Sequence, residues 1–489
     1  MKILTLLAVA VVSAGTVVAQ TATPDTAAVA GAGKTVLGLD DCLRIALSES
    51  PTVKVADMDI VRVDYSRKET LGNILPTVAF GGTYSRMLAK QVAYMNLGDM
   101  PGMGGGDSDA SQTPDAEQRS SSDKKDTGFK MGLDNSYQLG FSASLPLFAP
   151  QLWQALKLSD AQIAQSVEQA RASRLNLVNQ VKNAYYALML AKDSRRVVQE
   201  SYDMAKLTHD MYVKRQSVGD ASEYDVLRTS VAMKNVEPEI TQADIAISRA
   251  RLQLFVLMGI NPDDGAGIDF AGQLADYEDG MYEYVLSLGN DFSNNTSLRQ
   301  NELQTNTLEQ TVKMHKKAWY PTLSLSASYN WTSSSDGNPL RNFRWNPYSM
   351  VGITLNVPLF QGFQRYYRIR QAEVQVDMAR MQHDDLVNSV NMQVKLARDN
   401  IRLNVKQIES CNESVGQAQK AYDIMHQTFD IGAASYLDLR DSELALTRSR
   451  LAYFQAVYNY LIAGAELELL LGNAVDASTV PVPDRSKFK

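Results

Sequence analysis

Two short stretches decide how this chain folds. One reads FSASLPLFAPQL at residues 141–152, and the other reads ITLNVPLFQGFQ at residues 353–364. In each, apolar residues alternate with small polar ones up to a Pro-Leu-Phe corner, and a long helical pattern follows. Because successive side chains of a strand point to opposite faces, each stretch predicts a strand with one apolar face that leads directly into a helix.

The two corners belong to an internal duplication. Pro146 and Pro358 lie 212 positions apart, whereas Pro76 and Pro321, at the preceding strand starts, lie 245 apart. The drop from 245 to 212 places 33 extra residues between the two strands of the first half. Later anchors keep an offset of 213: Gly219, Ser222, Asp225 and Gly259 match Gly432, Ser435, Asp438 and Gly472. A repeat of this kind decides the architecture before any local motif does.

Each half contains two strand patterns of about 10 residues, at 76–86 and 137–147, then at 321–331 and 348–358. One face is apolar and the other small and polar, which is typical of a membrane barrel strand between lipid and water. A half-buried sheet of a soluble protein is the alternative. Aromatic residues near the strand ends are candidates for interfacial girdles: Tyr84, Tyr137, Trp319, Tyr329, Trp331, Trp345 and Tyr348.

The helical patterns are unusually long. Residues 150–217 contain no proline after Pro150 and no glycine, and residues 363–430 repeat the pattern with one internal glycine. At 1.5 Å per residue such a helix is about 100 Å long, so we expect coiled-coil-like packing rather than a globular core. Return helices are predicted at 221–258 and 433–471, with a kink at Pro238 in the first of them.

Composition excludes several classes of protein. The 489 residues carry a formal net charge of −7, which disfavours binding to a phosphate backbone, so no nucleic acid is expected as a partner. Only two cysteines and four histidines are present, which argues against a disulfide framework or a Cys/His zinc site. The chain also lacks a P-loop, a nucleophile elbow and an HExxH signature. We therefore expect no enzyme activity, no metal and no cofactor.

The first 19 residues have the features of a secretory signal peptide, with a basic start, an apolar run and small residues before Gln20. Residues 20–36 are expected to form a flexible lead-in. The remaining chain has no apolar run of about 18 residues or more, so any membrane span must be made of strands. The loop at 87–136 is rich in glycine and polar residues and is expected to face solvent.

Together these features resemble the TolC-type outer-membrane efflux proteins. The likeness covers about residues 37–473 and includes the opening motif LGLDDCLRIAL at 37–47, the two Pro-Leu-Phe corners and two Gly-x-x-Ser-x-x-Asp hairpin tips. It implies a mainly α-helical chain with a membrane β-barrel, a periplasmic α-barrel of long helices and a small equatorial region. The corresponding segments are a first repeat at 37–262, a linker at 263–295, a second repeat at 296–473 and a C-terminal tail at 474–489.

The resemblance also implies a homotrimer. Four strands cannot close a barrel and eight leave an interior filled by side chains, whereas twelve strands from three chains enclose a water-filled pore. Such a protein is a passive duct in the outer membrane that extends into the periplasm. The partners that the resemblance implies are outer-membrane lipid, a periplasmic adaptor (membrane fusion protein) and an inner-membrane pump of the RND, ABC or MFS type.

Two other classes are weighed against the duct. A structural periplasmic coiled-coil or envelope scaffold without transport activity would explain the helices, but not the four alternating strands between mirrored helix pairs. An enzyme or soluble binding protein would need a polar constellation in a pocket, and the sequence shows none.

The candidate site residues lie at the hairpin tips. Asp438 and Asp441 match the spacing of the acidic ring that narrows the periplasmic entrance in the family, and Asp225 is the first-repeat equivalent of Asp438. In a trimer each position would become a ring of three carboxylates that attracts cations and raises the pKa values of its members. The alternative is a solvated first helical turn, where aspartate suits the helix dipole.

The same tips also resemble the region where family members contact their adaptor. The residues concerned are Val218, Gly219, Ser222, Ile431, Gly432 and Ser435. The alternative is that the glycines serve only to turn the chain. One departure concerns the latch. The family's type member latches its tip with a tyrosine and an arginine, and Phe429 and Ala434 stand at these places here. Arg228 and Arg440 are possible substitutes by proximity.

Overall fold

A computed structural model describes residues 35–93, 129–277, 289, 291–336 and 344–472. The expected signal peptide, most of the lead-in, residues 94–128 of the long first loop and the C-terminal tail lie outside the described residues. The chain divides into two compact units. Among the described residues, unit 1 comprises 35–50, 177–277 and 402–465, and unit 2 comprises 51–93, 129–176, 289, 291–336, 344–401 and 466–472.

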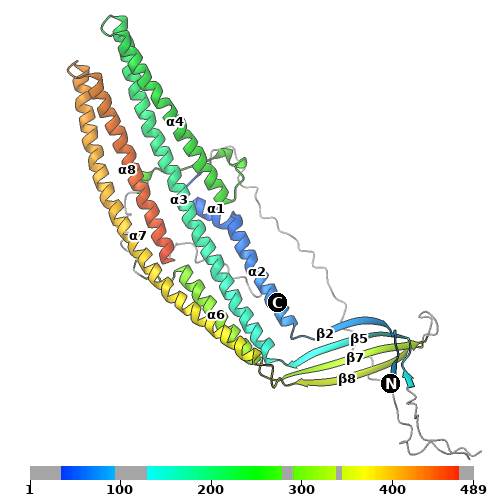
Figure 1. The fold of residues 1–489 in the computed structure, drawn as a ribbon. Coiled ribbons are helices and arrows are strands. Elements are labelled where there is room, and N and C mark those ends of the chain that lie inside the picture. Colours follow the sequence, from blue (N-terminus) through cyan, green and yellow to red (C-terminus); the bar gives the residue numbers. More distant parts are fainter. Residues whose placement is uncertain (1–34, 94–128, 278–288, 290, 337–343, 473–489) are drawn as a thin grey trace, which may run out of the picture. The chain divides into compact units, whose positions relative to one another are not determined.

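Unit 2 contains a four-stranded antiparallel sheet in the order β2-β5-β7-β8 (Figure 1). Its strands are β2 (Thr77–Arg86), β5 (Asn135–Phe148), β7 (Thr322–Ser335) and β8 (Asn346–Asn356). Each repeat contributes one pair, and β5 joins β7 across the repeats over almost its whole length. β2 and β8 are therefore the two edges of this sheet.

The register confirms the predicted alternation. Leu145, Leu325 and Ile353 lie side by side on one face, and the next row on the opposite face is Ser144, Ser326 and Gly352. Strand β7 runs four residues beyond the predicted end at 331, because its last residues still pair with the start of β5. The register shifts between Pro146 and Phe148, where proline has no amide hydrogen to give to the ladder.

Seven helices accompany the strands in the described residues: α1 (Leu39–Glu49), α2 (Pro51–Gly72), α3 (Pro150–Ser217), α4 (Glu223–Met258), α6 (Thr296–Lys317), α7 (Gln364–Asp430) and α8 (Tyr436–Leu471). Within the part of the chain that the structure covers, no helix is apolar over enough residues to span a membrane. Helix α4 continues through Pro238 without ending there. The return helices begin two and three residues later than predicted, because serine caps precede them.

Unit 1 holds a second, smaller sheet. β1 (Thr35–Leu37) pairs in parallel with β6 (Ile268–Phe270), which lies between the short 3-10 helices η2 (Asp264–Gly267) and η3 (Leu274–Tyr277). Residues 35 and 36 therefore belong to a strand and not to a flexible lead-in, because the expected linker offers them backbone partners. The Lys192 ammonium donates to the Phe270 carbonyl at 2.6 Å and so attaches this linker to α3.

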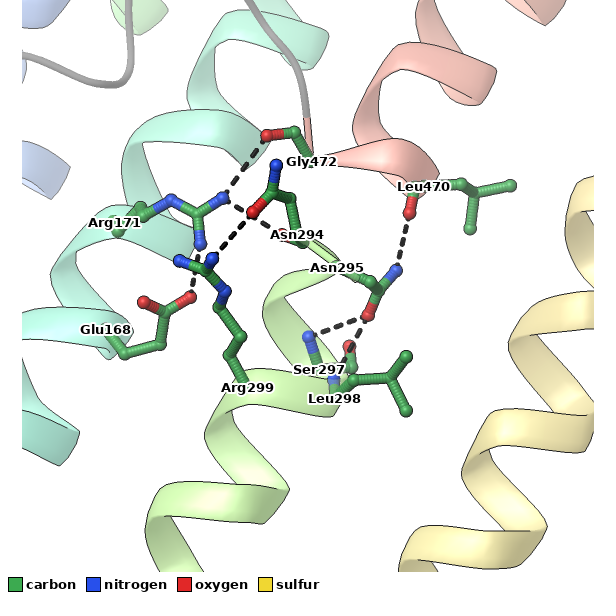
Figure 2. A network of polar contacts seen from close by, with 9 residues as sticks. All are labelled: Glu168, Arg171, Asn294, Asn295, Ser297, Leu298, Arg299, Leu470 and Gly472. Carbon is green, nitrogen blue, oxygen red and sulfur yellow. Dashed lines mark hydrogen bonds and ion pairs between the residues drawn. The ribbon is translucent and has the colours of Figure 1, made fainter. Parts of the chain in front are cut away.

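A polar network in unit 2 connects α3 with the start of α6 and the end of α8 (Figure 2). The Arg171 guanidinium pairs with Glu168 at 2.7 Å and donates to the carbonyls of Asn294 and Gly472 at 2.9 and 3.2 Å. Asn295 caps α6 and also donates to the Leu470 carbonyl at 2.7 Å. Burial raises the pKa of Glu168 while Arg171 opposes the rise. The C-terminal end of α8 is thus held by hydrogen bonds from α3 and from the N-cap residue of α6.

Gly140 and Gly81 face each other across β5 and β2 and offer a matched pair of substitutions. A Cβ at Gly140 would come within 2.1 Å of Asn330 Oδ1 and 2.8 Å of the Tyr329 carbonyl, whereas a Cβ at Gly81 meets nothing within 4 Å. We expect Gly140→Ala to cost about 1–3 kcal/mol of folding free energy through overpacking, and Gly81→Ala to cost less than half of that. The quantity to measure is the temperature at which the folded protein converts to the unfolded form, as seen by the change in its mobility on a gel. Equal temperatures for both variants would contradict the close packing of β5 on β7.

Candidate functional site at the two hairpin tips

The first tip reverses the chain between α3 and α4 in unit 1. Gly219 has a φ of +82°, and its amide donates to the Gln216 carbonyl at 3.0 Å. The Asp220 amide donates to the Arg215 carbonyl at 2.8 Å. This pair of bonds is a Schellman motif, in which a left-handed glycine satisfies the last carbonyls of the helix.

The second tip, between α7 and α8, repeats this geometry. Gly432 has a φ of +75°, and its amide donates to the Phe429 carbonyl at 2.9 Å. The Ala433 amide donates to the Thr428 carbonyl at 2.9 Å. No atom lies within 4 Å of a Cβ built at either glycine, so backbone conformation rather than lack of space requires glycine at both turns. The apolar residues just before them are strongly exposed, Val218 at 78% and Ile431 at 80%.

Both return helices start with a serine–aspartate capping box. The Ser222 hydroxyl donates to Asp225 Oδ2 at 2.6 Å and accepts the Asp225 amide at 3.2 Å. The Ser435 hydroxyl does the same with Asp438, at 2.6 and 3.3 Å. Such boxes satisfy amides that the first turn of a helix leaves without partners. The hydrogen bonds from Ser222 hold the pKa of Asp225 below its usual value.

In the structure, Asp225 and Asp438 therefore help to cap the first turns of α4 and α8. The motif Ser-x-x-Asp in the sequence could have revealed this role. Asp441 lies one turn further along α8 and is exposed. Within a single chain, the bonds from serine favour the ionised form of Asp225. A rise in pKa through crowding needs several carboxylates at one mouth and so depends on further copies of the chain.

Aromatic side chains join the two hairpins close to their tips. Phe429 is buried, and its ring lies 6.3 Å from that of Tyr212 on α3. Tyr436 on α8 makes an edge contact with the same Tyr212 ring at 5.8 Å. Burial raises the pKa of Tyr212 and of Tyr436. Phe429, one of the two departures from the family latch, thus packs against the first repeat without a hydroxyl group.

Two arginines of the first repeat complete this cross-hairpin cluster of Tyr212, Arg215, Arg228, Phe429 and Tyr436. The Arg215 guanidinium lies over the Phe429 ring at 5.7 Å and over the Tyr212 ring at 5.9 Å. The Arg228 guanidinium lies over the Tyr436 ring at 5.1 Å. A cation over a ring face is attracted by the ring quadrupole, by about 0.5–1 kcal/mol at exposed sites.

The other proposed substitute, Arg440, serves its own helix. Its guanidinium pairs with the buried Glu443 at 3.4 Å, one turn further along α8. Burial raises the pKa of Glu443, and the nearby Arg440 opposes the rise. Of the two arginines named from the sequence, Arg228 contacts the opposite hairpin. Sequence reasoning missed Tyr212, Arg215 and Tyr436, because helical spacing does not show which faces of two distant hairpins meet.

In the ranges that the structure describes, no group of three or more His, Cys, Asp or Glu residues could hold a metal ion. The candidate site therefore consists of two capped turns, two exposed apolar residues, the carboxylates of α4 and α8, and the cross-hairpin cluster.

Known proteins resemble this chain over most of its length. The family model for outer membrane efflux proteins matches residues 42–260 and 290–473, which include both tips and all four strands of the larger sheet. Outer membrane protein TolC of Escherichia coli (strain K12) is 22% identical over 365 residues, covering 70% of this chain and 73% of TolC. The alkaline protease secretion protein AprF of Pseudomonas aeruginosa is 24% identical over 347 residues, covering 70% of this chain and 71% of AprF.

A solved structure has the same fold. The crystal structure of the outer membrane protein VceC from Vibrio cholerae superposes with a TM-score of 0.65 at 17% identity. The superposition covers 89% of this chain and 96% of VceC.

A double-mutant cycle tests the cross-hairpin cluster. We expect Arg228→Gln and Tyr436→Leu to show a coupling of about 0.5–1 kcal/mol, because either change alone removes the same cation–ring contact. The quantity to measure is the opening free energy of tip amides in α4 and α8 by hydrogen exchange. Arg228→Gln with Tyr202→Leu is the control cycle, since Tyr202 precedes Tyr212 on α3 by about 15 Å. Zero coupling in the first cycle, or equal coupling in both, would contradict the contact.

Proposed function

The chain belongs to the outer membrane efflux protein family, and we propose that it is the gated channel-tunnel of a tripartite efflux or secretion system. The family consists of outer-membrane channel proteins and not of enzymes. In this proposal the chain passively conducts substrates from an inner-membrane pump and the periplasm to the exterior. The observation that carries it is the larger sheet, whose register separates an apolar face from a face of serine, threonine and glycine.

The pore requires three copies of the chain. β2 and β8 are the edges of the larger sheet, and nearly all of their residues are exposed. Pairing β8 of one copy with β2 of the next gives twelve strands from three copies, with the polar face inside and the apolar face toward lipid. Such pairing also satisfies the backbone groups at the edges.

The helices would continue this pore as a periplasmic tunnel. Helix α4 carries exposed residues at a spacing of seven: Tyr224, Val231, Pro238, Ile245 and Leu252. A repeat of seven is typical of helices that pack side by side. Its exposure in a single chain supports packing against another copy.

The entrance would lie at the hairpin tips. Asp438 and Asp441, together with Asp225, would form rings of carboxylates that concentrate cations in a narrow mouth. Asp441 is exposed and free to face such a mouth. The cross-hairpin cluster would hold α7 and α8 against α3 and α4 in the closed state, in place of the tyrosine and arginine latch of the family's type member.

The adaptor would dock at the same tips. Val218 and Ile431 offer apolar surface, the turns at Gly219 and Gly432 allow close backbone approach, and Ser222 and Ser435 flank them. We propose a periplasmic adaptor as the direct partner and a pump of the RND, ABC or MFS type behind it.

Removing the gate charges should open the channel. We expect Asp438→Asn with Asp441→Asn to raise the single-channel conductance in planar bilayers and to abolish block by divalent cations, because the amides keep their size without the negative charge. Asparagine at 438 can still accept the Ser435 amide, so the helix cap is largely retained.

The control variant carries the same change of charge elsewhere on an exposed helix surface, at Glu237→Gln with Glu239→Gln on α4. It should conduct and be blocked like the wild type. Wild-type conductance and block in the double asparagine variant would reject the gate residues. A wild-type chain that forms no pore would instead favour a structural scaffold.

The adaptor proposal is tested at Gly432. Gly432→Val forces a β-branched residue into the left-handed region, at a cost of about 1–2 kcal/mol in the turn. We expect it to abolish export and the photo-crosslink from Val218 to the adaptor, while the trimer still assembles. Gly416→Val in the middle of α7 is the control, because a Cβ there also meets no atom within 4 Å and φ is not left-handed. Loss of the trimer in Gly432→Val would mean that the turn is only structural.

A further inference from the structure

Exposed apolar and aromatic side chains gather where the larger sheet meets the helices. Thr322 of β7 pairs with Asn356 of β8, so the connection from α6 into β7 and the connection from β8 into α7 lie at the same end of the sheet (Figure 1). The second connection exposes 84% of Leu359, 73% of Phe360 and 63% of Phe363. Three large apolar side chains that are exposed side by side form a patch, and such patches on a protein surface mark a site of contact with another molecule or a membrane.

The backbone holds two of these rings in place. Gly362 and Phe363 both have left-handed conformations, with φ of +56° and +60°. Phe363 is the only non-glycine residue with positive φ among the residues that the structure describes, and a bulky residue rarely adopts this conformation. The Phe360 and Phe363 rings touch edge to face at 5.4 Å. The strained turn thus presents a pair of rings to the surroundings.

Cationic residues surround this connection. The end of α6 and the start of α7 supply six of them: Lys313, Lys316, Lys317, Arg365, Arg368 and Arg370. The only carboxylate within 313–320 and 361–373 is Glu373. Its oxygens pair with Lys316 at 2.9 Å and with Arg370 at 3.0 Å, so one acid bridges α6 and α7.

The two cationic segments are adjacent in space. Besides the bridge through Glu373, the positive charge of Arg368 adds to burial in lowering the pKa of His315 on α6. The Lys317 ammonium lies over the Tyr320 ring at 4.8 Å. Across the described ranges, Lys317, Arg365 and Arg368 are in no ion pair.

We propose that this cationic junction, defined by the six residues named above, binds the anionic head groups of phospholipids at the membrane surface. A row of rings beside lysine and arginine is the pattern of side chains that lie at a lipid–water interface. The excess of positive charge distinguishes anionic from zwitterionic lipid. The apolar face of the sheet, which begins at Leu323 and Leu355, continues directly from it. The inference rests on the outer-membrane location of the chain and not on the gate or the adaptor.

The test uses the full-length protein in dodecyl maltoside, titrated with phosphatidylglycerol or phosphatidylcholine. Bound lipid is counted by native mass spectrometry, and the melting temperature reports the linked stabilisation. We expect phosphatidylglycerol to bind more tightly and to raise the melting temperature, and 1 M NaCl to weaken this effect by screening. Lys317→Gln, Arg365→Gln and Arg368→Gln together should lower the affinity for phosphatidylglycerol by about a hundredfold, since each of the three cations contributes roughly fivefold and the factors multiply.

Lys206→Gln, Lys420→Gln and Arg448→Gln form the control, because they remove the same charge from exposed positions on α3, α7 and α8. This variant should bind phosphatidylglycerol like the wild type. Should the first triple variant fail to fold, Arg368→Gln alone is expected to lose about fivefold. Equal binding of both lipids by the wild type, equal losses in both triple variants, or equal stabilisation by inorganic phosphate would overturn the proposal.

Discussion

Backbone groups that face lipid have no water to bond, and this constraint governs the whole chain. In the larger sheet, β5 and β7 have neighbours on both sides, whereas β2 and β8 are edges. An open edge inside a membrane leaves several polar groups unpaired, each at a cost of several kcal/mol. In the proposed trimer, pairing of β8 of one copy with β2 of the next would give these edge groups their backbone partners. The four strands of one chain would then be a third of the pore.

Most of the core of this chain is formed by its helices. A sheet of four short strands cannot support a large core. The long helices instead bury narrow stripes of apolar side chains along one face. Their ends are fixed by hydrogen bonds rather than by bulk packing, as at Arg171, which holds the carbonyls of Asn294 and Gly472. At the opposite ends of α3 and α7, glycine turns and serine caps satisfy the backbone within each hairpin. Each turn is thus stabilised by hydrogen bonds within its own hairpin.

Contacts between the hairpins at the tips are of a different kind. The cross-hairpin cluster consists of ring contacts and two arginines, each worth on the order of 1 kcal/mol or less. In the proposed gate, contacts of this strength would break when a partner pulls the hairpins apart, and their directionality would define the closed arrangement. They also depend little on a single hydrogen bond, which suits a chain with Phe429 where the family's type member has tyrosine.

Repeats and periodicity in the amino-acid sequence were enough to determine the duplication, the four two-faced strands and the long helices, because these follow from spacings of 213, of two and of about 3.6 residues. They also located both tips, since Gly-x-x-Ser-x-x-Asp describes a turn and a cap within one segment. Only the tertiary structure decided that β5 pairs with β7, that residues 35 and 36 join a sheet with β6, and that Arg228 rather than Arg440 contacts the other hairpin. Each of these depends on which faces of distant segments meet, and local spacing carries no information about that choice.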